Sequence, residues 1–207
     1  KGGRAFLVLF IFSVLLILLA ATVSAADVAY LYKKTYNIDD NILDVFNKSG
    51  LTVETISDTQ IPTKLSAANL NNYKLIFVGD ERFTNAAKIP VDKKPTIIAN
   101  YYHGLTFGLT DYDGISKLAS TSPLSVRKNS QIIKVYTQAK FNNKPISIPY
   151  YYLDDENKAD GMQTAARTYT GNSYDFGDVI SYANEGTQLK NGKTTLGKIC
   201  FYGIVES

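Results

Sequence analysis

The sequence predicts an α/β protein with a mostly parallel sheet and antiparallel additions in its C-terminal half. Three short runs, at residues 28–32, 74–78 and 96–99, are almost continuously apolar, as expected for strands covered on both faces of a parallel sheet. Helical patterns alternate with these runs, which is the order typical of a sheet covered by helices. In the second half, short strand patterns separated by turn residues favour antiparallel pairing.

The first half of the chain alternates between strands and helices. After the strand at residues 28–32, an apolar stripe at helical spacing predicts a helix over residues 39–48. Asp39 or Asp40 can cap this helix, and Gly50 can end it. The later elements of this half are a strand at 51–56, a helical turn at 66–71, a strand at 74–78 that ends at Gly79, and a strand at 96–99.

The second half is predicted to add short strands to this sheet. We expect paired strands at residues 131–138 and 147–153 around a turn at 142–144, a helical segment at 159–166 and a strand at 179–182. The pair Asn191-Gly192 is a strong hairpin signal, and a last strand follows at 198–202.

The N-terminal segment has the order of a secretory signal peptide. Lys1 and Arg4 precede an apolar run at residues 5–21, and small residues follow to Ala26. We expect residues 1–26 to be removed, and residues 27–207 to form one domain, incomplete at its C-terminus, that is secreted or held at the cell surface. The run is also close to the shortest one that spans a bilayer, so an uncleaved anchor or a pilin-like stem is the alternative.

Composition excludes some classes of function. The chain has 22 basic and 19 acidic residues, and loss of Lys1 and Arg4 leaves it close to neutral. Without a basic stripe, nucleic-acid binding has little electrostatic support. A single cysteine, Cys200, permits no internal disulfide, so the domain has to be stabilised by its core.

Four short motifs carry a family resemblance. They are residues 74–80, residues 94–98, Ser122-Pro123-Leu124 and residues 197–203. On these motifs, residues 27–207 resemble the class I glutamine amidotransferase-like superfamily, in its ThuA-like, non-catalytic exported branch. The resemblance implies a flavodoxin-like three-layer sandwich.

The resemblance also implies where a nucleophile would stand. Active members carry a cysteine on the sharp turn after the strand that matches residues 96–99, where backbone N–H groups can stabilise an oxyanion. Here the turn, residues 100–104, holds neither cysteine nor serine. The resemblance therefore implies the scaffold without amidotransferase chemistry.

Two loops are the candidate ligand site, because open α/β sheets bind ligands at the carboxyl ends of their strands. The first loop offers Asp80 and Glu81, and the second offers Asn100, Tyr101 and His103. Asp80, Glu81 and His103 are also the candidate acid and base residues. The alternative is that Asp80 caps a turn, Glu81 is solvated and His103 is a hydrogen-bonded structural histidine.

We expect no metal and no cofactor. One histidine excludes a three-histidine zinc site within the chain. Asp111 and Asp113 only partly match a calcium loop, because the later ligands are absent. No glycine-rich phosphate-binding spacing occurs. The acidic cluster at residues 154–157 follows three tyrosines and is interpreted as a solvated loop, or else as a contact for a cation or a sugar.

The sequence thus favours an exported, non-catalytic domain that binds a ligand or serves a structural role. Its expected partners are a carbohydrate or a cell-surface protein, with no nucleic acid, and a membrane only if the N-terminal segment is retained. The first alternative is an extracytoplasmic hydrolase of carbohydrate or peptide material. The second is a membrane-anchored or pilin-like surface subunit.

Overall fold

The computed structural model describes residues 26–113, 115–120, 124–128, 131–135, 140–141, 144–145, 148–168 and 177–204. The expected signal peptide, apart from Ala26, lies outside the described residues, as do Ser122 and Pro123 of the third family motif. Within the described part of the chain, none of the helices has the length and apolar character needed to cross a bilayer.

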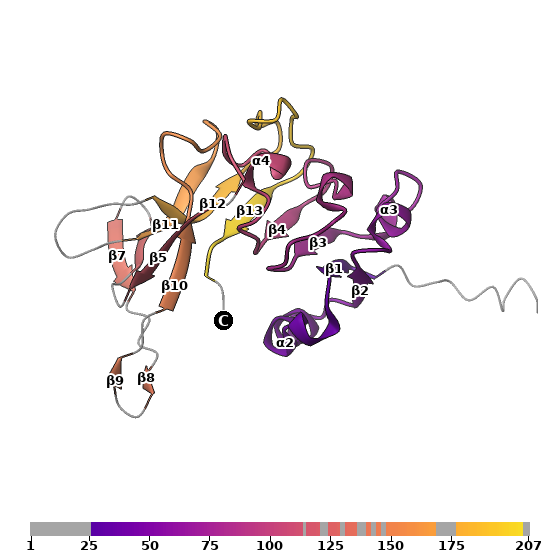
Figure 1. The fold of residues 1–207 in the computed structure, drawn as a ribbon, viewed down its shortest axis with the longest axis horizontal. Coiled ribbons are helices and arrows are strands. Elements are labelled where there is room, and N and C mark those ends of the chain that lie inside the picture. Colours follow the sequence, from indigo (N-terminus) through magenta and orange to yellow (C-terminus); the bar gives the residue numbers. More distant parts are fainter. Residues whose placement is uncertain are drawn as a thin grey trace, which may run out of the picture.

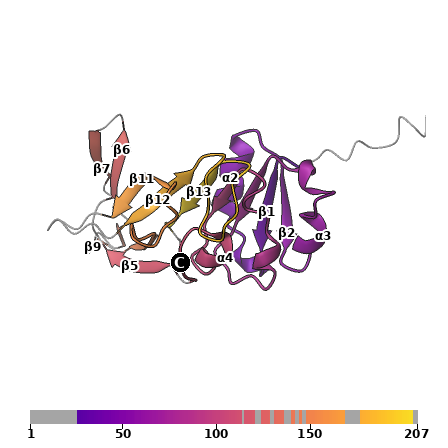
Figure 2. The same cartoon turned by 90° about the horizontal axis from the view of Figure 1, so that it is seen from above.

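The described strands include one sheet of nine, in which a parallel half continues into an antiparallel half (Figure 1). Their spatial order is β2 (Val53–Ser57), β1 (Val28–Tyr32), β3 (Leu75–Val78), β4 (Thr96–Ile98), β13 (Ile199–Tyr202), β12 (Asp178–Ala183), β11 (Gln163–Thr168), β6 (Leu124–Lys128) and β7 (Gln131–Val135). Pairing is parallel from β2 to β13 and antiparallel from β13 to β7. Figure 2 shows the β6–β7 hairpin at the far end from β1 and β2.

Two small antiparallel pairs and several short helices complete the described fold. β5 (Ser116–Ser120) pairs with β10 (Ile148–Tyr152), and β8 (Lys140–Phe141) pairs with β9 (Lys144–Pro145). The helices are α2 (Asp40–Lys48), α3 (Ile61–Lys64) and α4 (Gly104–Phe107), with 3₁₀ turns η1 (Thr35–Asn37), η2 (Leu70–Asn72) and η3 (Ala86–Lys88).

The parallel strands are apolar on both faces because each face has a core of its own. In β1, Ala29 and Leu31 belong to the larger core, which α3, η2, η3 and α4 help to form, whereas Val28 and Tyr30 pack beside Phe46 of α2. Figure 1 shows α2 on one side of the sheet and α3 and α4 on the other. This confirms the predicted α/β class and is consistent with a flavodoxin-like sandwich. The predicted parallel neighbours β1, β3 and β4 are also confirmed.

Helix α2 begins and ends where the sequence predicts. The Asp39 carboxylate accepts hydrogen bonds from the N–H groups of Asn41, at 2.8 Å, and Ile42, at 3.3 Å, which caps the helix. Gly50 follows the helix with φ +74°, a left-handed conformation that favours glycine. Phe46 packs edge-on against Phe77 of β3, with ring centroids 5.7 Å apart.

The helical turn expected at residues 66–71 is confirmed in part, and a second predicted helical segment is wrong. The Leu70 N–H donates to the Ser66 carbonyl at 2.8 Å, which closes one turn, and the 3₁₀ turn η2 begins at Leu70. The short helix α3, which precedes this turn, was not predicted. Pro62 suits the first turn of α3, and Ile61 and Leu65 are buried one turn apart. Residues 163–166, expected to be helical, belong to strand β11, because pairing with β12 and β6 outweighs the helical preference of the local sequence.

The predicted partners in the second half are also wrong. β7 pairs with β6 rather than with β10, and β10 pairs with β5, about thirty residues earlier in the chain. Only two residues separate β6 from β7 in the sequence, so they can pair as a close hairpin. The last strand, β13, lies where the sequence predicts it and inserts between β4 and β12, which joins the two halves.

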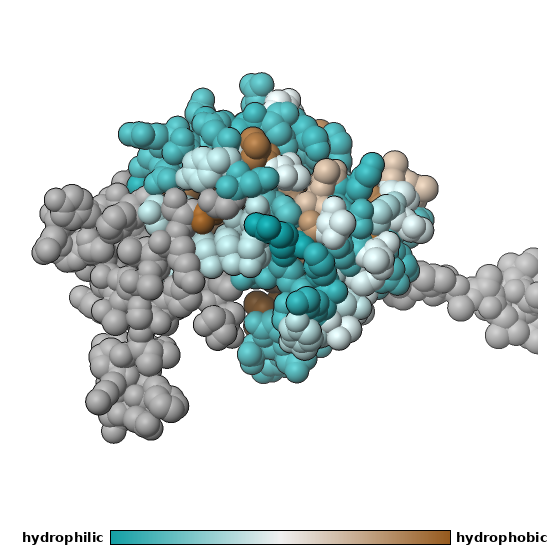
Figure 3. All heavy atoms as spheres, viewed as in Figure 1, coloured by the Kyte–Doolittle hydropathy of each residue, from teal (hydrophilic) through white to brown (hydrophobic). Residues whose placement is uncertain are grey.

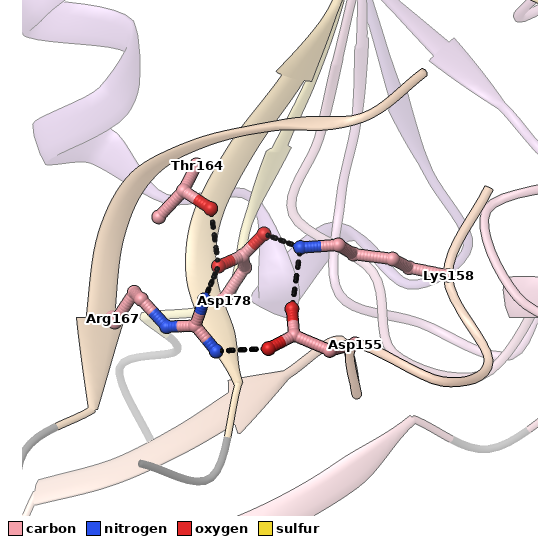
Figure 4. A network of polar contacts seen from close by, with 5 residues as sticks. All are labelled: Asp155, Lys158, Thr164, Arg167 and Asp178. Atoms are coloured by element: carbon pink, nitrogen blue, oxygen red, sulfur yellow. Dashed lines mark hydrogen bonds and ion pairs between the residues drawn. The ribbon is translucent and has the colours of Figure 1, made fainter. Parts of the chain in front are cut away.

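A network of ion pairs holds β11, β12 and the loop before β11 together (Figure 4). The fully buried Asp178 carboxylate lies 2.6 Å from Lys158 Nζ and accepts a hydrogen bond from the Thr164 hydroxyl at 2.8 Å. Asp155 bridges Lys158 and Arg167 from the solvent side. Burial favours a neutral Lys158, but its hydrogen bonds to both carboxylates outweigh burial and raise its pKa. The acidic cluster is thus a largely exposed loop, which agrees with the solvated-loop interpretation, and within it Asp155 also forms ion pairs.

Candidate ligand-binding site

The two candidate loops lie together at the carboxyl ends of β3 and β4. The Asn100 side-chain amide donates hydrogen bonds to the carbonyls of Gly79, at 2.8 Å, and Glu81, at 2.7 Å. The Phe83 N–H donates to His103 Nε2 at 3.0 Å. Asn100 and His103 are both buried, so these bonds form where water competes little. The structure thus joins the two loops, and it does so through Asn100 and His103.

Glu81 organises a third loop, the one that follows β1. Its buried carboxylate accepts hydrogen bonds from the N–H groups of Lys33 and Lys34 and from the Asn37 side-chain amide. A carboxylate that accepts several N–H groups is strongly held, because each of these bonds is charge-assisted. Glu81 therefore positions residues 33–37.

His103 is held as a neutral acceptor. Its Nε2 accepts the Phe83 N–H, so the ring proton resides on Nδ1. The ring also packs edge-on against Phe107, at 5.6 Å between centroids. Burial lowers the pKa of His103 below its ordinary value of 6.5, which favours the neutral ring. The geometry matches the structural role that was the alternative for this residue.

This environment predicts a pH dependence of stability. Because the pKa is lower in the folded protein, the unfolded chain binds a proton more readily, and His103 destabilises the fold as the pH falls below about 6.5. Glutamine at this position has a carbonyl that can accept the Phe83 N–H, but it does not titrate. His103→Gln should therefore make the free energy of unfolding depend less on pH between about pH 6.5 and pH 5. Denaturant titrations of both proteins across this range measure the effect. An equal slope in the two proteins would contradict the assignment.

Tyr101 belongs to a stack of three tyrosines. Its ring lies between Tyr102, at 3.9 Å, and Tyr151 of β10, at 3.8 Å, and the hydroxyls of Tyr101 and Tyr102 are hydrogen-bonded. The hydrogen bond to Tyr101 and burial, with a contribution from the Asp80 carboxylate, raise the pKa of Tyr102 to about 12. The phenol of Tyr102 is therefore neutral near pH 7, and the stack is suited to packing.

A groove of about 530 Å³ lies next to these loops, between α2 and the sheet. Its walls are formed by Tyr30, Tyr36, Asn37, Ile38, Asp39, Asn41, Ile42, Val45, Phe77, Gly79, Asp80, Ala99, Tyr202 and Ile204. In Figure 3, drawn in the view of Figure 1, apolar surface (brown) shows between the C-terminal end of the described chain and α2.

The groove coincides with the topological switch point of the sheet. From β1 the chain crosses to β2 on one side, whereas β3 pairs with β1 on the other side. The loops that leave β1 and β3 therefore diverge, and open α/β sheets place their ligands in the resulting crevice. Residues 36–39 line the groove from the first loop, and Gly79 and Asp80 line it from the second.

The groove is acidic and offers no ready anion site. Among the described residues that line it, Asp39 and Asp80 are the charged ones, and none is lysine, arginine or histidine. The N-terminus of α2 faces this region, but the Asp39 carboxylate already accepts the N–H groups of Asn41 and Ile42. A bound phosphate would therefore be repelled by two carboxylates, and it would have to compete with Asp39 for the amide N–H groups of the helix.

Of the five predicted site residues, Asp80 is the one that lines the groove. Glu81, Asn100 and His103 brace the surrounding loops, and Tyr101 lies in the tyrosine stack. Sequence reasoning missed the groove residues that follow β1: Tyr36, Asn37, Asp39 and Asn41. The signal for them was available, because the loop after the first strand of a doubly wound sheet borders the switch point.

The acidic residues near α4 have structural partners. Asp113 Oδ1 accepts the N–H groups of Leu105, at 3.0 Å, and Thr106, at 3.2 Å, in the first turn of α4. Asp111 forms an ion pair with Lys190 at 3.4 Å. Across the described residues, histidine, cysteine and carboxylate side chains form no group of three suited to holding a metal ion.

Neither the protein-family models nor the curated proteins contain a match to this chain. The groove and the loops around it are therefore the basis for inferring a function.

Proposed function

We propose that this chain is an exported, non-catalytic binding domain of the amidotransferase-like fold, and that its ligand site is the groove between α2 and the sheet. The observation that carries the proposal is the position of the groove at the topological switch point. Its lining combines aromatic and aliphatic side chains with carboxylates and amides, the mixture that small-molecule sites use.

Two further observations favour binding over hydrolysis. A hydrolase built on the candidate residues would need Glu81 or His103 as acid or base, yet Glu81 accepts three N–H groups of its surroundings and His103 Nε2 accepts the Phe83 N–H. Cys200 lies within β13 rather than on a strand-end turn, and burial raises the pKa of its thiol, which disfavours the nucleophilic thiolate.

The location of the protein is proposed from the N-terminal segment. Its basic, apolar and small-residue order supports export. In an exported protein the groove would be exposed to the extracytoplasmic compartment. A carbohydrate or a surface protein is the expected partner in that compartment. N-terminal sequencing of the exported protein should give Ala26 or Asp27 as the first residue, and a mature chain that retains residues 6–19 would favour the anchored or pilin-like alternatives.

Resonance mapping tests the binding site. Backbone amide resonances of the purified protein are recorded with a library of small polar compounds that contains sugars, amines, nucleotides and dipeptides. We expect at least one compound to shift the resonances of residues 36–45 and Asp80 together, and to leave those of the distant Asn191-Gly192 turn unchanged. If every compound at millimolar concentration leaves the groove resonances in place, this groove is not the ligand site.

A further inference from the structure

We propose that the groove binds an uncharged saccharide, with Tyr36 as a stacking platform at its rim; this inference rests on the proposed binding function. The groove presents polar side chains from the loop after β1 and from α2, and rings and aliphatic groups from the sheet. A sugar offers hydroxyl groups at its edge and C–H groups on its face, so it matches both kinds of surface.

The charges around the groove disfavour an anion. Asp39 and Asp80 lie in its lining, and a bound phosphate or carboxylate would have to approach both. The amides at the start of α2, which bind anions in many doubly wound proteins, are already engaged by Asp39 at 2.8 Å and 3.3 Å. A nucleotide would thus lose the interactions that usually hold it at a switch point.

The rim disfavours a cation. Lys34 Nζ lies 5.4 Å from the centroid of the Tyr36 ring, so the tyrosine already carries a cation–π contact. A cationic ligand that stacks on Tyr36 would meet this ammonium group. The two carboxylates of the lining repel an anion, and Lys34 repels a cation that stacks on Tyr36, so a ligand with no net charge avoids both repulsions.

The groove also supplies the contacts that a sugar needs. Tyr36 is 75% exposed, and it is one of two large hydrophobic residues in the groove lining, with Val45, that are mostly exposed. A solvent-exposed aromatic ring gains by being covered with an apolar face. Among the other lining residues, the Asn37 amide is oriented by its 3.0 Å hydrogen bond to Glu81, and Asn41 lies in the first turn of α2. A carboxylate can accept hydrogen bonds from sugar hydroxyls, and an amide can both accept and donate them.

Titration calorimetry with defined probes tests this inference. The purified protein is titrated with cellotriose, maltotriose and chitobiose as neutral sugars, with AMP and inorganic phosphate as anions, and with spermidine as a cation. We expect at least one sugar to bind, and AMP, phosphate and spermidine to bind at least tenfold more weakly. Tyr36→Ala should weaken sugar binding about tenfold, whereas Tyr36→Phe should retain it. Leu196→Ala, at an exposed apolar residue that does not line the groove, is the matched control and should bind like the original protein.

The outcomes separate this inference from the proposed function. If AMP or spermidine binds and shifts the groove resonances while the sugars do not, the saccharide inference is wrong and the binding function stands. If a sugar binds equally well to the original protein and to Tyr36→Ala, Tyr36 is not the platform and the inference is wrong. If none of these probes binds, the inference is wrong, and the wider compound library decides the proposed function.

Discussion

Replacing Lys158 with methionine is expected to lower the free energy of unfolding by about 3–5 kcal/mol, because the substitution leaves the buried Asp178 carboxylate without its closest cation. Methionine keeps most of the apolar stem of the side chain, so the loss reports on charge more than on packing. The Thr164 hydroxyl remains at 2.8 Å, and Arg167 lies farther away, at 3.6 Å. Chemical denaturation measures the change.

The matched control is Lys48→Met. Lys48 pairs with Asp44 on the surface of α2, with side chains that are 75% and 55% exposed, and such a pair contributes less than about 1 kcal/mol. A loss in Lys158→Met no larger than that in the control would show that the buried network does not stabilise the second half of the domain.

Gly203→Ala is expected to destabilise the fold by about 3 kcal/mol, at the upper end of the cost of overpacking. A Cβ at this position would lie 2.0 Å from the Tyr151 carbonyl oxygen and 2.9 Å from that of Val179, which are backbone atoms that cannot move away cheaply. Gly203 also joins β10 to β12, since its carbonyl accepts the Tyr151 N–H and its N–H donates to Val179, both at 2.8 Å. The added methyl group would separate the two strands.

Gly186→Ala separates this steric effect from the conformational effect of losing a glycine. Gly186 has φ +85°, but no neighbouring atom lies within 4 Å of the position that an alanine methyl group would take. Only the left-handed backbone should therefore resist the change, at a cost of about 1–2 kcal/mol. Thermal and denaturant unfolding of the two variants should rank Gly203→Ala as the less stable. The reverse order would contradict the close approach at Gly203.

The parallel half of the fold could be predicted because its signals are local. β1, β3 and β4 are covered on both faces and therefore read as continuous apolar runs, and α2 carries its stripe, its Asp39 cap and Gly50. β11 could not be predicted in this way. Its residues have no strong strand pattern, and they become a strand through pairing with β12 and β6, which is tertiary information.

The sequence was enough to predict which loops form the candidate site, but it was not enough to predict which partners their side chains contact. The ends of β3 and β4 indicated that Asp80 and Asn100 lie near each other, as the hydrogen bonds around Asn100 bear out. Glu81 and His103 accept hydrogen bonds from backbone N–H groups. These bonds depend on where residues 33–34 and Phe83 lie in the folded chain. No sequence spacing encodes those positions.

The most direct test of the groove uses a single fluorophore at its rim. The chain has no tryptophan, so Tyr36→Trp places one at the groove, and Leu196→Trp places one at an exposed control position. With the ligand found by resonance mapping, or with maltotriose if a sugar binds, we predict a saturable change in the emission of Tyr36→Trp and none in that of Leu196→Trp. Saturable binding that leaves the emission of Tyr36→Trp unchanged would contradict a ligand site in this groove.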